Sequence, residues 1–480
     1  MKAVNRVTRI LELNSVAVRI HSTLTGREEE LVPLYPDGLL RMYVCGLTPK
    51  FHTHVGHARV FVAMDVLRRY LEYCGYRVKY VQNFTDVDDK IILRAQESGQ
   101  SARAVAETYM QAYFANMDRL NVRRAEEYPT VTAYMERIIE FVAGLVEGGK
   151  AYAVDGDVWF DVAMFPDYGK LSHRDLNSQL VAARKELEPG KRDPRDFALW
   201  KRAKAGEPSW PSPWGRGRPG WHIECSAMAR ETLGDQLDIH GGGADLIFPH
   251  HENEIAQSES LTGKVPFVRH WAHAGLVTVD EEKMANSGGN FFTLESLLQT
   301  YDPAPVRLYL IGTHYRSPLA FSVDGGGVRG IEDARGALGR LRRALGPEPL
   351  APGEDLDSEA IDTFKAAMDA DFNTPDALAV IFDLAREANR LRDAAAPRAE
   401  LDRARRTMLH LLDVLGIDLT TVDQQQAIDP YVDLLLDVRR KLREAKQWAL
   451  ADEIRGRLDS LGIIVEDKPG GESTWRPADR

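Results

Sequence analysis

The chain has few cysteines and no long apolar run, and both absences narrow what it can be. Only Cys45, Cys74 and Cys225 occur among 480 residues. They are too few for a disulfide framework and fit a reducing cytosol, in which thiols stay free to bind metal or fill a core. No apolar run approaches the roughly 20 residues that span a bilayer, and the first residues lack a secretory apolar region. We therefore expect a cytoplasmic protein without a membrane segment.

A surplus of positive charge is also lacking. The formal net charge is −11 at pH 7, which argues against a protein that coats polyanions nonspecifically, although a local basic face is still compatible with it. Hydrophobic residues make up 44% of the chain, as in ordinary globular proteins. A length of 480 residues exceeds a single core and predicts roughly three domains.

The front of the chain predicts a parallel sheet. A strand over 40–44 runs into Cys45, apolar residues over 55–73 recur at helical intervals, and a second strand follows at 77–81. A strand-helix-strand unit of this kind favours parallel strands, whose ligands bind at their carboxyl ends. Cys45 is expected at that edge.

The remaining stretches predict an interrupted sheet followed by helices. Residues 91–150 look mostly helical, whereas 151–220 is rich in Pro, Gly and Trp and predicts an irregular insertion. Strand-like pieces return at 237–240 and 276–279. Helical periodicity then dominates 331–346 and 358–415, and it predicts a helical bundle. A linker is expected over 420–430, before a last helical piece with a basic cluster, Arg439, Arg440, Lys441, Arg443 and Lys446, which is either a solvated face or a phosphate contact.

Four separated residues are candidate metal ligands. Cys45, Cys225, His250 and Glu254 carry the thiolate, imidazole and carboxylate groups that zinc prefers. His250 and Glu254 are four residues apart and share one helix face. The alternative for residues 249–254 is a capped helix start rich in polar side chains. Cys74 is expected to lie in the core.

The segment His54-Val55-Gly56-His57 is a candidate phosphate-binding turn. Free N–H groups and the positive dipole end attract phosphate at a helix start, and imidazoles three residues apart project to the same side. Gly56 allows another group to approach closely. Such donors suit the charge that develops when a phosphate is attacked. A surface or structural role is the alternative.

Several short motifs occur in a specific order. They cover residues 42–46, 54–59, 81–91, 195–201, 220–226, 239–243, 248–254 and 371–375. Together they resemble the cysteinyl-tRNA synthetases, and the resemblance extends over about residues 18–476. It implies an α/β fold: a Rossmann-type parallel-sheet catalytic domain with a connective insertion, then an all-α helical bundle and a small C-terminal anticodon-binding region. The expected boundaries are 16–120 and 216–280 for the catalytic halves, 121–215 for the insertion, 281–329 for a stem-contact region with the ATP loop, 330–425 for the bundle and 426–480 for the anticodon-binding region.

The resemblance also assigns roles to residues. It implies one Zn²⁺ per chain on Cys45, Cys225, His250 and Glu254, which receives the thiolate of substrate cysteine. A soft thiolate binds zinc far better than a hydroxyl, so the metal can reject serine where shape alone cannot. The expected cysteine-binding residues are Gly46, Thr48, Thr85 and Trp221. The expected ATP-binding residues are His54, Gly56, His57, His240, Lys283 and Asn286, of which His54, His57 and Lys283 are catalytic, with Mg²⁺ accompanying ATP.

Some of these residues have a plainer alternative. Trp221 either closes the pocket around the small substrate side chain or is a buried anchor. Asp86 is expected to help Thr85 hold the amino acid, whereas Asp88 and Asp89 can equally be loop and cap residues.

The sequence departs from the family in the ATP loop. The usual Lys-Met-Ser-Lys-Ser is replaced by Lys283-Met284-Ala285-Asn286-Ser287. Asn286 offers only a neutral amide where a lysine normally counters phosphate charge. Lys283, Lys50 and a bound Mg²⁺ are the candidates to compensate, and Lys50 stands where the family usually carries tyrosine.

The expected function is a cysteine–tRNA ligase that forms cysteinyl-adenylate and transfers the cysteinyl group to the 3′ end of tRNA(Cys). Its partners would be tRNA(Cys), ATP and L-cysteine, and the chain would be a monomer. Arg439, Arg440, Lys441 and Trp448 are candidate tRNA contacts. The first alternative is a ligase of the mycothiol type, which gives cysteine to a small amine. The second is a catalytically weakened paralogue that binds tRNA.

Overall fold

The computed structural model describes residues 17–174, 189–279, 282–283, 292–324, 327–419, 424–467 and 473–477. The chain divides into two compact units, Met1–Asp418 and Leu419–Arg480. Among the described residues, no helix is both long enough and apolar enough to cross a bilayer.

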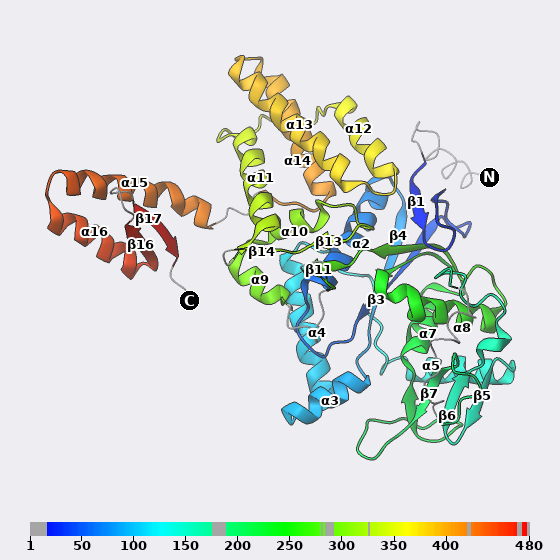
Figure 1. Cartoon of the computed structure of the whole chain (residues 1–480). Helices are drawn as coiled ribbons and strands as arrows, with labels where there is room; N and C mark the ends of the chain where they lie inside the picture. The colour runs from blue at the N-terminus through cyan, green and yellow to red at the C-terminus, as the bar shows by residue number, and fades with distance from the viewer. Residues whose placement is uncertain are drawn as a thin grey trace. The chain divides into compact units, whose positions relative to one another are not determined.

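A parallel sheet lies within the first unit (Figure 1). Its strands are β3 (Leu39–Leu47), β4 (Arg77–Phe84), β9 (Leu237–Gly243) and β10 (Val268–Ala274), in the spatial order β10-β9-β3-β4. All of β9 is buried, as is typical of parallel strands that are covered on both faces. Helix α2 (Val55–Tyr73) connects β3 to β4. The predicted strand-helix-strand unit and the α/β fold class are confirmed.

The direction of the connections reverses between β3 and β9. The chain passes from β3 to its neighbour β4 on one side, and from β9 to its neighbour β10 on the other. In open parallel sheets, ligands bind at the carboxyl ends of the two strands that flank such a reversal. Tyr43 of β3 pairs with His240 of β9, so Cys45 and residues 241–243 follow at the same edge.

Helices and a second sheet separate the two halves of the parallel sheet. Helices α3 (Asp89–Ser98), α4 (Ala102–Arg119) and α5 (Met135–Glu147) confirm the predicted helical stretch. The irregular insertion expected over 151–220 was wrong, because that stretch contains an antiparallel sheet. Its strands are β5 (Ala151–Val154), β6 (Asp157–Phe160), β7 (Phe197–Arg202) and β8 (Gly217–Pro219), and they are neighbours in the sheet in that order. The short 3₁₀ helix η1 (Val162–Met164) follows β6 along the chain.

Many of the glycines and prolines that suggested irregular structure lie at the edge of this second sheet. Those of residues 203–219 occupy the connection between β7 and β8 and the edge strand β8 itself, where a proline is tolerated because no neighbour needs its N–H. A Cβ atom at Gly217 would lie 2.3 Å from the carbonyl oxygen of Lys201. Glycine is therefore required for the close approach of β8 to β7, and it is compatible with a strand here.

The chain then returns to the parallel sheet. Helix α7 (Trp221–Leu233) leads into β9, and η2 (Ala244–Leu246), η3 (Ile247–His251) and α8 (Glu252–Thr262) connect β9 to β10. The hairpin of β1 (Arg19–Ser22) and β2 (Arg27–Glu30) lies beside β10. The elements after β10 are β11 (Val277–Val279), β12 (Glu282–Lys283), α9 (Leu294–Thr300), α10 (Pro303–Ile311), β13 (Leu319–Ala320), β14 (Val323–Asp324) and β15 (Gly327–Val328). The strands predicted at 237–240 and 276–279 are confirmed by β9 and β11.

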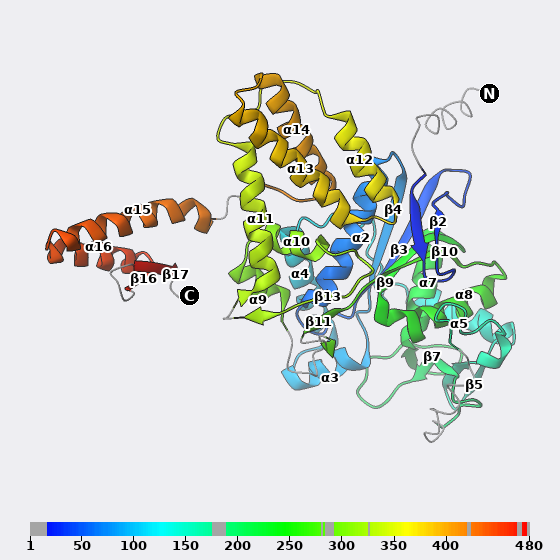
Figure 2. The same cartoon turned by 45° about the horizontal axis from the view of Figure 1, so that its top comes forward.

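A helical bundle completes the first unit (Figure 2). It contains α11 (Arg329–Leu345), α12 (Ser358–Asp369), α13 (Thr374–Asp393) and α14 (Arg398–Val414). Leu338, Leu341, Ile381, Met408 and Leu411 are among its fully buried side chains. The predicted bundle is confirmed, because the apolar residues at helical spacing face one another.

Asp371 fastens the bundle to the rest of the unit. The residue is buried and has a φ of +57°. Its carboxylate accepts hydrogen bonds from the His21 N–H at 2.8 Å, the Tyr315 hydroxyl at 2.8 Å and the Arg316 Nε at 2.5 Å. Its own N–H donates to the carbonyl oxygen of Arg19 at 3.1 Å. One side chain thus joins the bundle to the β1–β2 hairpin and to the loop after α10.

Tyr70 of α2 makes a second junction, which predicts a stability effect. Its hydroxyl donates to Asp369 Oδ1 at 2.6 Å, and both residues are buried. We expect Tyr70→Phe to lower the free energy of unfolding by about 1 kcal/mol, because the ring packing is kept while the carboxylate loses a donor. Urea denaturation of the full chain measures the change, with the exposed Tyr431→Phe as control. Equal denaturation midpoints for the two variants would contradict the expectation.

The second unit is a helical pair with a β-hairpin. Its elements are α15 (Gln424–Glu444), α16 (Trp448–Ser460), β16 (Ile463–Asp467) and β17 (Ser473–Pro477). Val432, Leu436, Leu458 and Val465 form its core. The linker expected over 420–430 was too long, because α15 already begins at Gln424. The glutamines there are good helix formers, despite their polarity.

The expectation for Arg439 also needs correction. Its side chain is 2% exposed, with Nη1 2.6 Å from Asp467 Oδ1 and a further bond to the Ser473 hydroxyl. A buried guanidinium in a bidentate ion pair has a structural role, because the carboxylate of Asp467 neutralises its charge inside the unit. It is therefore not a candidate contact for nucleic acid, whereas Arg440, Lys441 and Trp448 remain exposed.

Candidate active site

The four candidate metal ligands come together at the edge of the parallel sheet. Cys45 lies on β3, Cys225 on α7, His250 in η3 and Glu254 on α8. All four are buried, and their possible ligand atoms lie within 4.8 Å of one another. The Sγ atoms of the cysteines are 3.6 Å apart, and His250 Nε2 is 3.0 Å from Glu254 Oε1. Residues separated by more than two hundred positions thus converge on one point.

Cys45 lies within an irregular part of β3. The pairing register of β3 with β4 shifts between Val44 and Leu47. Within that shift the N–H of Gly46 donates to Asn83 Oδ1 at 2.8 Å, and a Cβ at Gly46 would lie 1.6 Å from the Asn83 carbonyl oxygen. Only glycine fits such an approach. The strand irregularity re-aims the neighbouring side chains, as bulges beside functional sites commonly do.

The charge state of the group suits a cation. The hydrogen bond from Cys45 lowers the pKa of the Cys225 thiol to about 6, while burial raises the pKa of Cys45. Although burial alone would raise it, His240 and His250 lower the pKa of Glu254 to about 2. A buried thiolate and a buried carboxylate side by side are costly unless a cation balances them. Two sulfurs, one imidazole and one carboxylate are a donor set that fits zinc.

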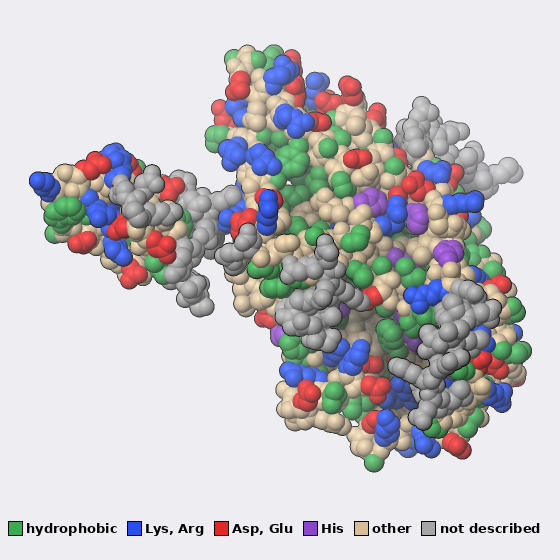
Figure 3. All heavy atoms as spheres, viewed as in Figure 1, with side chains coloured by type: hydrophobic (Ala, Val, Ile, Leu, Met, Phe, Trp, Pro, Cys, Tyr) green, Lys and Arg blue, Asp and Glu red, His purple; other side chains and the backbone are tan. Residues whose placement is uncertain are grey.

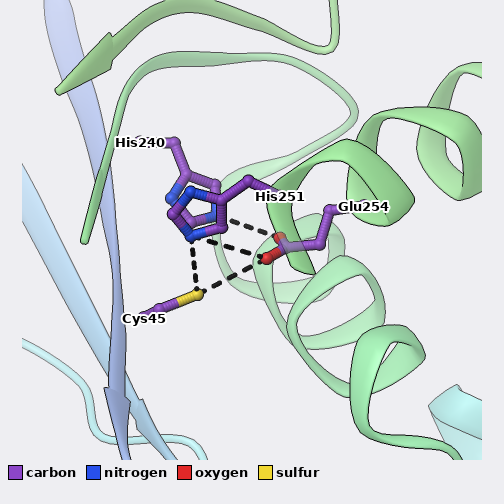
Figure 4. A group of neighbouring side chains, drawn as sticks. All are labelled: Cys45, His240, His251 and Glu254. Atoms are coloured by element: carbon purple, nitrogen blue, oxygen red, sulfur yellow. Dashed lines mark hydrogen bonds and ion pairs between the residues drawn. The ribbon is translucent and has the colours of Figure 1, made fainter. Parts of the chain in front are cut away.

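His251 and His240 form an overlapping set with Cys45 and Glu254 (Figure 4). His251 Nε2 lies 3.3 Å from Cys45 Sγ, and His240 Nε2 lies 2.9 Å from Glu254 Oε2. Burial, helped by the neighbouring His240, holds the pKa of His251 well below its usual value. His251 was not singled out from the sequence, although it adjoins His250.

A chain of hydrogen bonds runs on from His251 and away from the ligands. His251 Nδ1 is 2.7 Å from His273 Nε2, and His273 Nδ1 is 2.7 Å from the Thr23 hydroxyl. Outer partners of this kind fix the orientation of the side chains that touch a metal. His240 also lies against Trp271, with ring centroids 4.6 Å apart. The expected ATP-binding residue His240 therefore stands next to Glu254, deep in the group.

The expected cysteine-binding residues lie around the same strand ends. Gly46 lies near the end of β3 and Thr48 directly follows the strand. The N–H of Thr85 donates to the Leu47 carbonyl at 3.1 Å. The Thr85 hydroxyl donates to Glu224 Oε2 at 2.8 Å. Glu224 is fully buried, and burial raises its pKa well above the usual value. Glu224 could not be recognised from the sequence except by its place next to Cys225.

Trp221 lies at the rim of the group, as the first residue of α7. Its ring centroid is 4.4 Å from that of His250, and the side chain is 40% exposed. The exposure excludes the alternative of a buried anchor. His222, next along the chain, has Nδ1 3.1 Å from His250 Nδ1.

His54 and His57 form the start of α2. His54 is the N-cap: its Nδ1 accepts from the His57 N–H at 3.3 Å, and His57 Nδ1 accepts from the His54 N–H at 3.5 Å. The rings stack with centroids 3.6 Å apart. A Cβ at Gly56 would lie 2.9 Å from the His54 ring, so glycine lets that ring fold over the turn. Both Nδ1 atoms are acceptors, which places the ring protons on the Nε2 atoms.

The ATP loop can be followed only in part. Lys283 ends β12, where its backbone pairs with Thr278; its side chain and the whole of Asn286 lie outside the described residues. The described chain resumes at Phe292, whose carbonyl accepts from the Val55 N–H at 3.4 Å, and the Leu294 N–H donates to the Thr53 carbonyl at 2.7 Å. The segment that leaves the loop is thus bound to the His54 turn.

The three acidic residues that follow β4, Asp86, Asp88 and Asp89, have different contacts. Asp88 is the N-cap of α3, and its carboxylate accepts from the Lys90 N–H at 2.9 Å. Asp89 is 3.1 Å from Lys201 Nζ and also pairs with Arg218. The carboxylate of Asp86 pairs with Thr132. Cys74, expected in the core, is only half-buried.

Glu252 holds the loop 169–172 against α8. Its carboxylate accepts from the N–H groups of Gly169 at 2.9 Å, Leu171 at 3.3 Å and Ser172 at 2.8 Å. Lys170 in the same loop is 2.6 Å from Glu259. Successive N–H groups that converge on one carboxylate form a strong anion-binding turn. The loop 169–172 is therefore anchored to α8, which carries Glu254.

A sheet with a reversal of this kind, an insertion between its halves and a histidine turn at its first helix define a class I aminoacyl-tRNA synthetase. The family of tRNA synthetases class I (C) catalytic domains matches residues 32–325, and the DALR domain matches 363–420. The Mycobacterium tuberculosis methionyl-tRNA synthetase in complex with methionyl-adenylate superimposes with a TM-score of 0.56 at 16% identity, over 83% of this chain and 94% of that one. LeuRS of Agrobacterium radiobacter, in a ternary complex with tRNA and LeuAMS, gives a TM-score of 0.57 at 12% identity, over 93% and 91%. At such identities these two likenesses show the fold.

Within that class, the chain belongs to the cysteine–tRNA ligase family. The cysteinyl-tRNA ligase anticodon binding domain matches residues 425–476. The cysteine–tRNA ligase of Dehalococcoides mccartyi is 47% identical over 464 residues, covering 96% of this chain and 99% of that protein. The enzyme of the same name from Alkalilimnicola ehrlichii is 49% identical over 471 residues, with coverage of 96% and 99%. The resemblance noted in the sequence is confirmed, and the chain is an aminoacyl-tRNA ligase.

Proposed function

We propose that this cysteine–tRNA ligase activates L-cysteine with ATP and passes it to tRNA(Cys), using the residues gathered at the edge of the parallel sheet. One observation carries the proposal: the buried donor group of Cys45, Cys225, His250 and Glu254 lies beside strand β3, which leads within nine residues to His54. A thiol-selective site and a phosphate-binding turn are the two parts that cysteine activation needs.

Cys45, Cys225, His250 and Glu254 would hold one Zn²⁺ per chain. When bound, zinc supplies a position that prefers a thiolate to a hydroxyl, which separates cysteine from serine better than shape can. His222 and His251 touch these ligands and would hold them in place. Thr85, through Glu224, and the backbone around Gly46 and Thr48 would position the amino acid. Trp221, exposed at the rim, would cover the small side chain.

The His54 turn would bind the phosphates of ATP. Because both Nδ1 atoms accept backbone hydrogen bonds, the Nε2–H groups of His54 and His57 are the donors that can meet charge on the α-phosphate as the substrate carboxylate attacks it. Gly56 keeps the approach open, and the helix start adds its positive dipole end. We assign His240, Lys283 and Asn286 to the same nucleotide site, together with the Mg²⁺ that accompanies ATP. No side-chain nucleophile is needed, since the reaction depends on positioning and electrostatics.

The tRNA would contact the helical bundle and the C-terminal unit. The family match of residues 425–476 to an anticodon-binding domain supports this assignment. Within that unit Arg440, Lys441 and Trp448 are exposed and offer charge and a stacking surface for single-stranded bases. We further propose that the chain acts as a monomer in the cytoplasm.

An assay with purified chain, tRNA(Cys), ATP and cysteine tests the proposal. We expect cysteine-dependent ATP–pyrophosphate exchange and charging of tRNA, and we expect both to fall when a zinc chelator is added. Exchange without charging would instead favour a ligase that gives cysteine to a small amine. A chain that binds tRNA but shows no exchange would be the weakened paralogue. The matches over the bundle and the anticodon-binding region favour the first outcome.

A further inference from the structure

Arg59 of α2 is a buried arginine that follows His57 by two residues. Its side chain is 1% exposed, whereas Figure 3 shows many Lys and Arg side chains at the surface of the molecule, among acidic ones. Burial lowers the pKa of Arg59 to about 10, so the guanidinium is still charged at neutral pH. A buried charge is costly unless its surroundings compensate it. The groups that contact the guanidinium must therefore offset that cost.

The partners of Arg59 are carbonyl oxygens at the end of α10. Its Nη1 donates to the Leu310 carbonyl, and its Nη2 donates to the carbonyls of Thr313 at 2.9 Å and His314 at 2.7 Å. Helix α10 ends at Ile311. The last carbonyls of a helix have no partner within it and form the negative end of its dipole. Arg59 thus caps α10 from the side of α2, and the helix end in turn stabilises the buried charge.

The segment that follows α10 is held from two other directions. Asp371 of the bundle accepts from the Tyr315 hydroxyl at 2.8 Å and from Arg316 Nε at 2.5 Å. The Gly275 N–H, between β10 and β11, donates to the Tyr315 carbonyl at 2.7 Å. None of these contacts involves α2. The segment is therefore a fixed point against which Arg59 can set the position of its own helix.

Arg59 lies close to the candidate phosphate-binding turn along the helix. An α-helix rises about 1.5 Å per residue, so Arg59 follows His57 by about 3 Å of the helix axis. Only Ala58 lies between them, and α2 is continuous there. A shift of Arg59 would therefore move the His57 ring and the His54 ring stacked on it. A misplacement of about 1 Å can slow a reaction about 100-fold.

We propose that Arg59 is a positioning residue for adenylate formation, which holds the start of α2 and the His54 turn in place through the carbonyl oxygens at the end of α10. The proposal rests on the function proposed above and adds to it a residue that acts through His54 and His57. Further along α2, Asp65 binds Arg307 of α10 at 2.6 Å, and both side chains are buried. Loss of the Arg59 contacts would therefore leave the middle of α2 attached and affect its start.

The first test replaces Arg59 by lysine, which keeps the charge. A single compact ammonium group cannot reproduce the contacts that two separate guanidinium nitrogens make with three carbonyls. We expect Arg59→Lys to lower kcat for cysteine-dependent ATP–pyrophosphate exchange by about 10-fold or more. The KM for cysteine should stay within about 2-fold, because the donors of the turn act on the transition state. The rates are measured at a temperature at which thermal unfolding shows every variant to be folded.

Thr374→Val is the matched control for this substitution. The Thr374 hydroxyl donates to the Ile311 carbonyl at 2.7 Å, so valine removes a partner from the same helix end and leaves the hydrogen bonds of Arg59 in place. We expect a lower unfolding temperature and a near-normal kcat. Equal kcat values in the two variants would overturn the proposal, because Arg59 would then only stabilise the end of α10.

A double-mutant cycle tests whether Arg59 acts through the turn. In a His54→Asn background, Arg59→Lys should lower the rate of pyrophosphate exchange by a smaller factor than in the original chain, because one of the donors that it positions is already absent. Equal factors in both backgrounds would mean that the two residues act independently, and the proposal would be wrong.

Amide hydrogen–deuterium exchange separates this proposal from the proposed function. Mass spectrometry of the full chain reports on the N–H groups at the start of α2 and needs no catalysis. We expect a peptide over residues 55–61 to take up deuterium about 10-fold faster in Arg59→Lys than in Thr374→Val, because local opening of the helix start becomes easier. If the original chain shows no pyrophosphate exchange while this difference persists, the proposed activity fails and the anchoring of α2 by Arg59 is retained. Equal deuterium uptake in the two variants would overturn the anchoring itself.

Discussion

Cys225→Ser should lower cysteine-dependent ATP–pyrophosphate exchange by about 1,000-fold and release the bound metal. Cys225 is fully buried with its Sγ 3.6 Å from that of Cys45. A hydroxyl in its place stays protonated and is a poor ligand for zinc, so both metal affinity and the preference for a thiol substrate are lost. Metal content by atomic emission and the exchange rate are measured on the same preparation.

The chain offers its own control for that substitution. Cys74 is half-buried and outside the ligand group, so Cys74→Ser removes a thiol of the same protein without touching the site. We expect full metal content and near-normal exchange in this variant. A Cys225→Ser protein that still binds one zinc per chain would remove the cysteine from the ligand set. In that case the overlapping group of Cys45, His240, His251 and Glu254 would be the alternative.

His54→Asn should lower the rate of adenylate formation by about 100- to 1,000-fold with little change in stability. Asparagine is a good N-cap, so its side-chain oxygen can still accept from the first turn of α2. The imidazole Nε2–H is removed, and the loss of one preorganised donor to a developing charge has an effect of this size. The capping role, seen in the 3.3 Å bond from the His57 N–H, is thereby separated from the chemical role.

Single-turnover formation of cysteinyl-adenylate measures the effect, and thermal unfolding checks the fold. His410→Asn is the matched control, because His410 lies on α14 of the bundle with Nε2 3.4 Å from the Tyr73 hydroxyl. If His54→Asn kept its rate but unfolded at a lower temperature, the residue would be a helix cap and the phosphate would be bound elsewhere.

Local sequence patterns were sufficient for the elements that make up the sheet and the bundle. Helix α2 begins and ends where its apolar spacing indicated, because periodicity reports directly on a buried face. The sheet over β5–β8 was missed because its strands are short and its glycines and prolines lie mostly in the connections and at the edge strand β8, so composition outweighed alternation. Arg439 was misassigned because a run of basic residues does not show which one turns inward to Asp467.

Ligand chemistry and the family resemblance located the four candidate metal residues, but the groups around them were not predictable. Glu224, His251 and Glu252 act through partners that lie 80 or more positions away, such as Thr85, Cys45 and Gly169. No local pattern encodes such contacts, since they exist only when the sheet and the insertion have assembled.

Asp371 has a consequence for how this enzyme can be divided. Its buried carboxylate satisfies donors from His21, Tyr315 and Arg316, which belong to segments far from it in the sequence. A fragment that ends before the bundle would leave the buried Tyr315 hydroxyl, the His21 N–H and the more exposed Arg316 guanidinium without their common acceptor. We therefore expect the part of the unit that carries the parallel sheet to be less stable without the bundle. If a bound partner displaced the bundle, the carboxylate of Asp371 would transmit the displacement to the β1–β2 hairpin, which flanks β10.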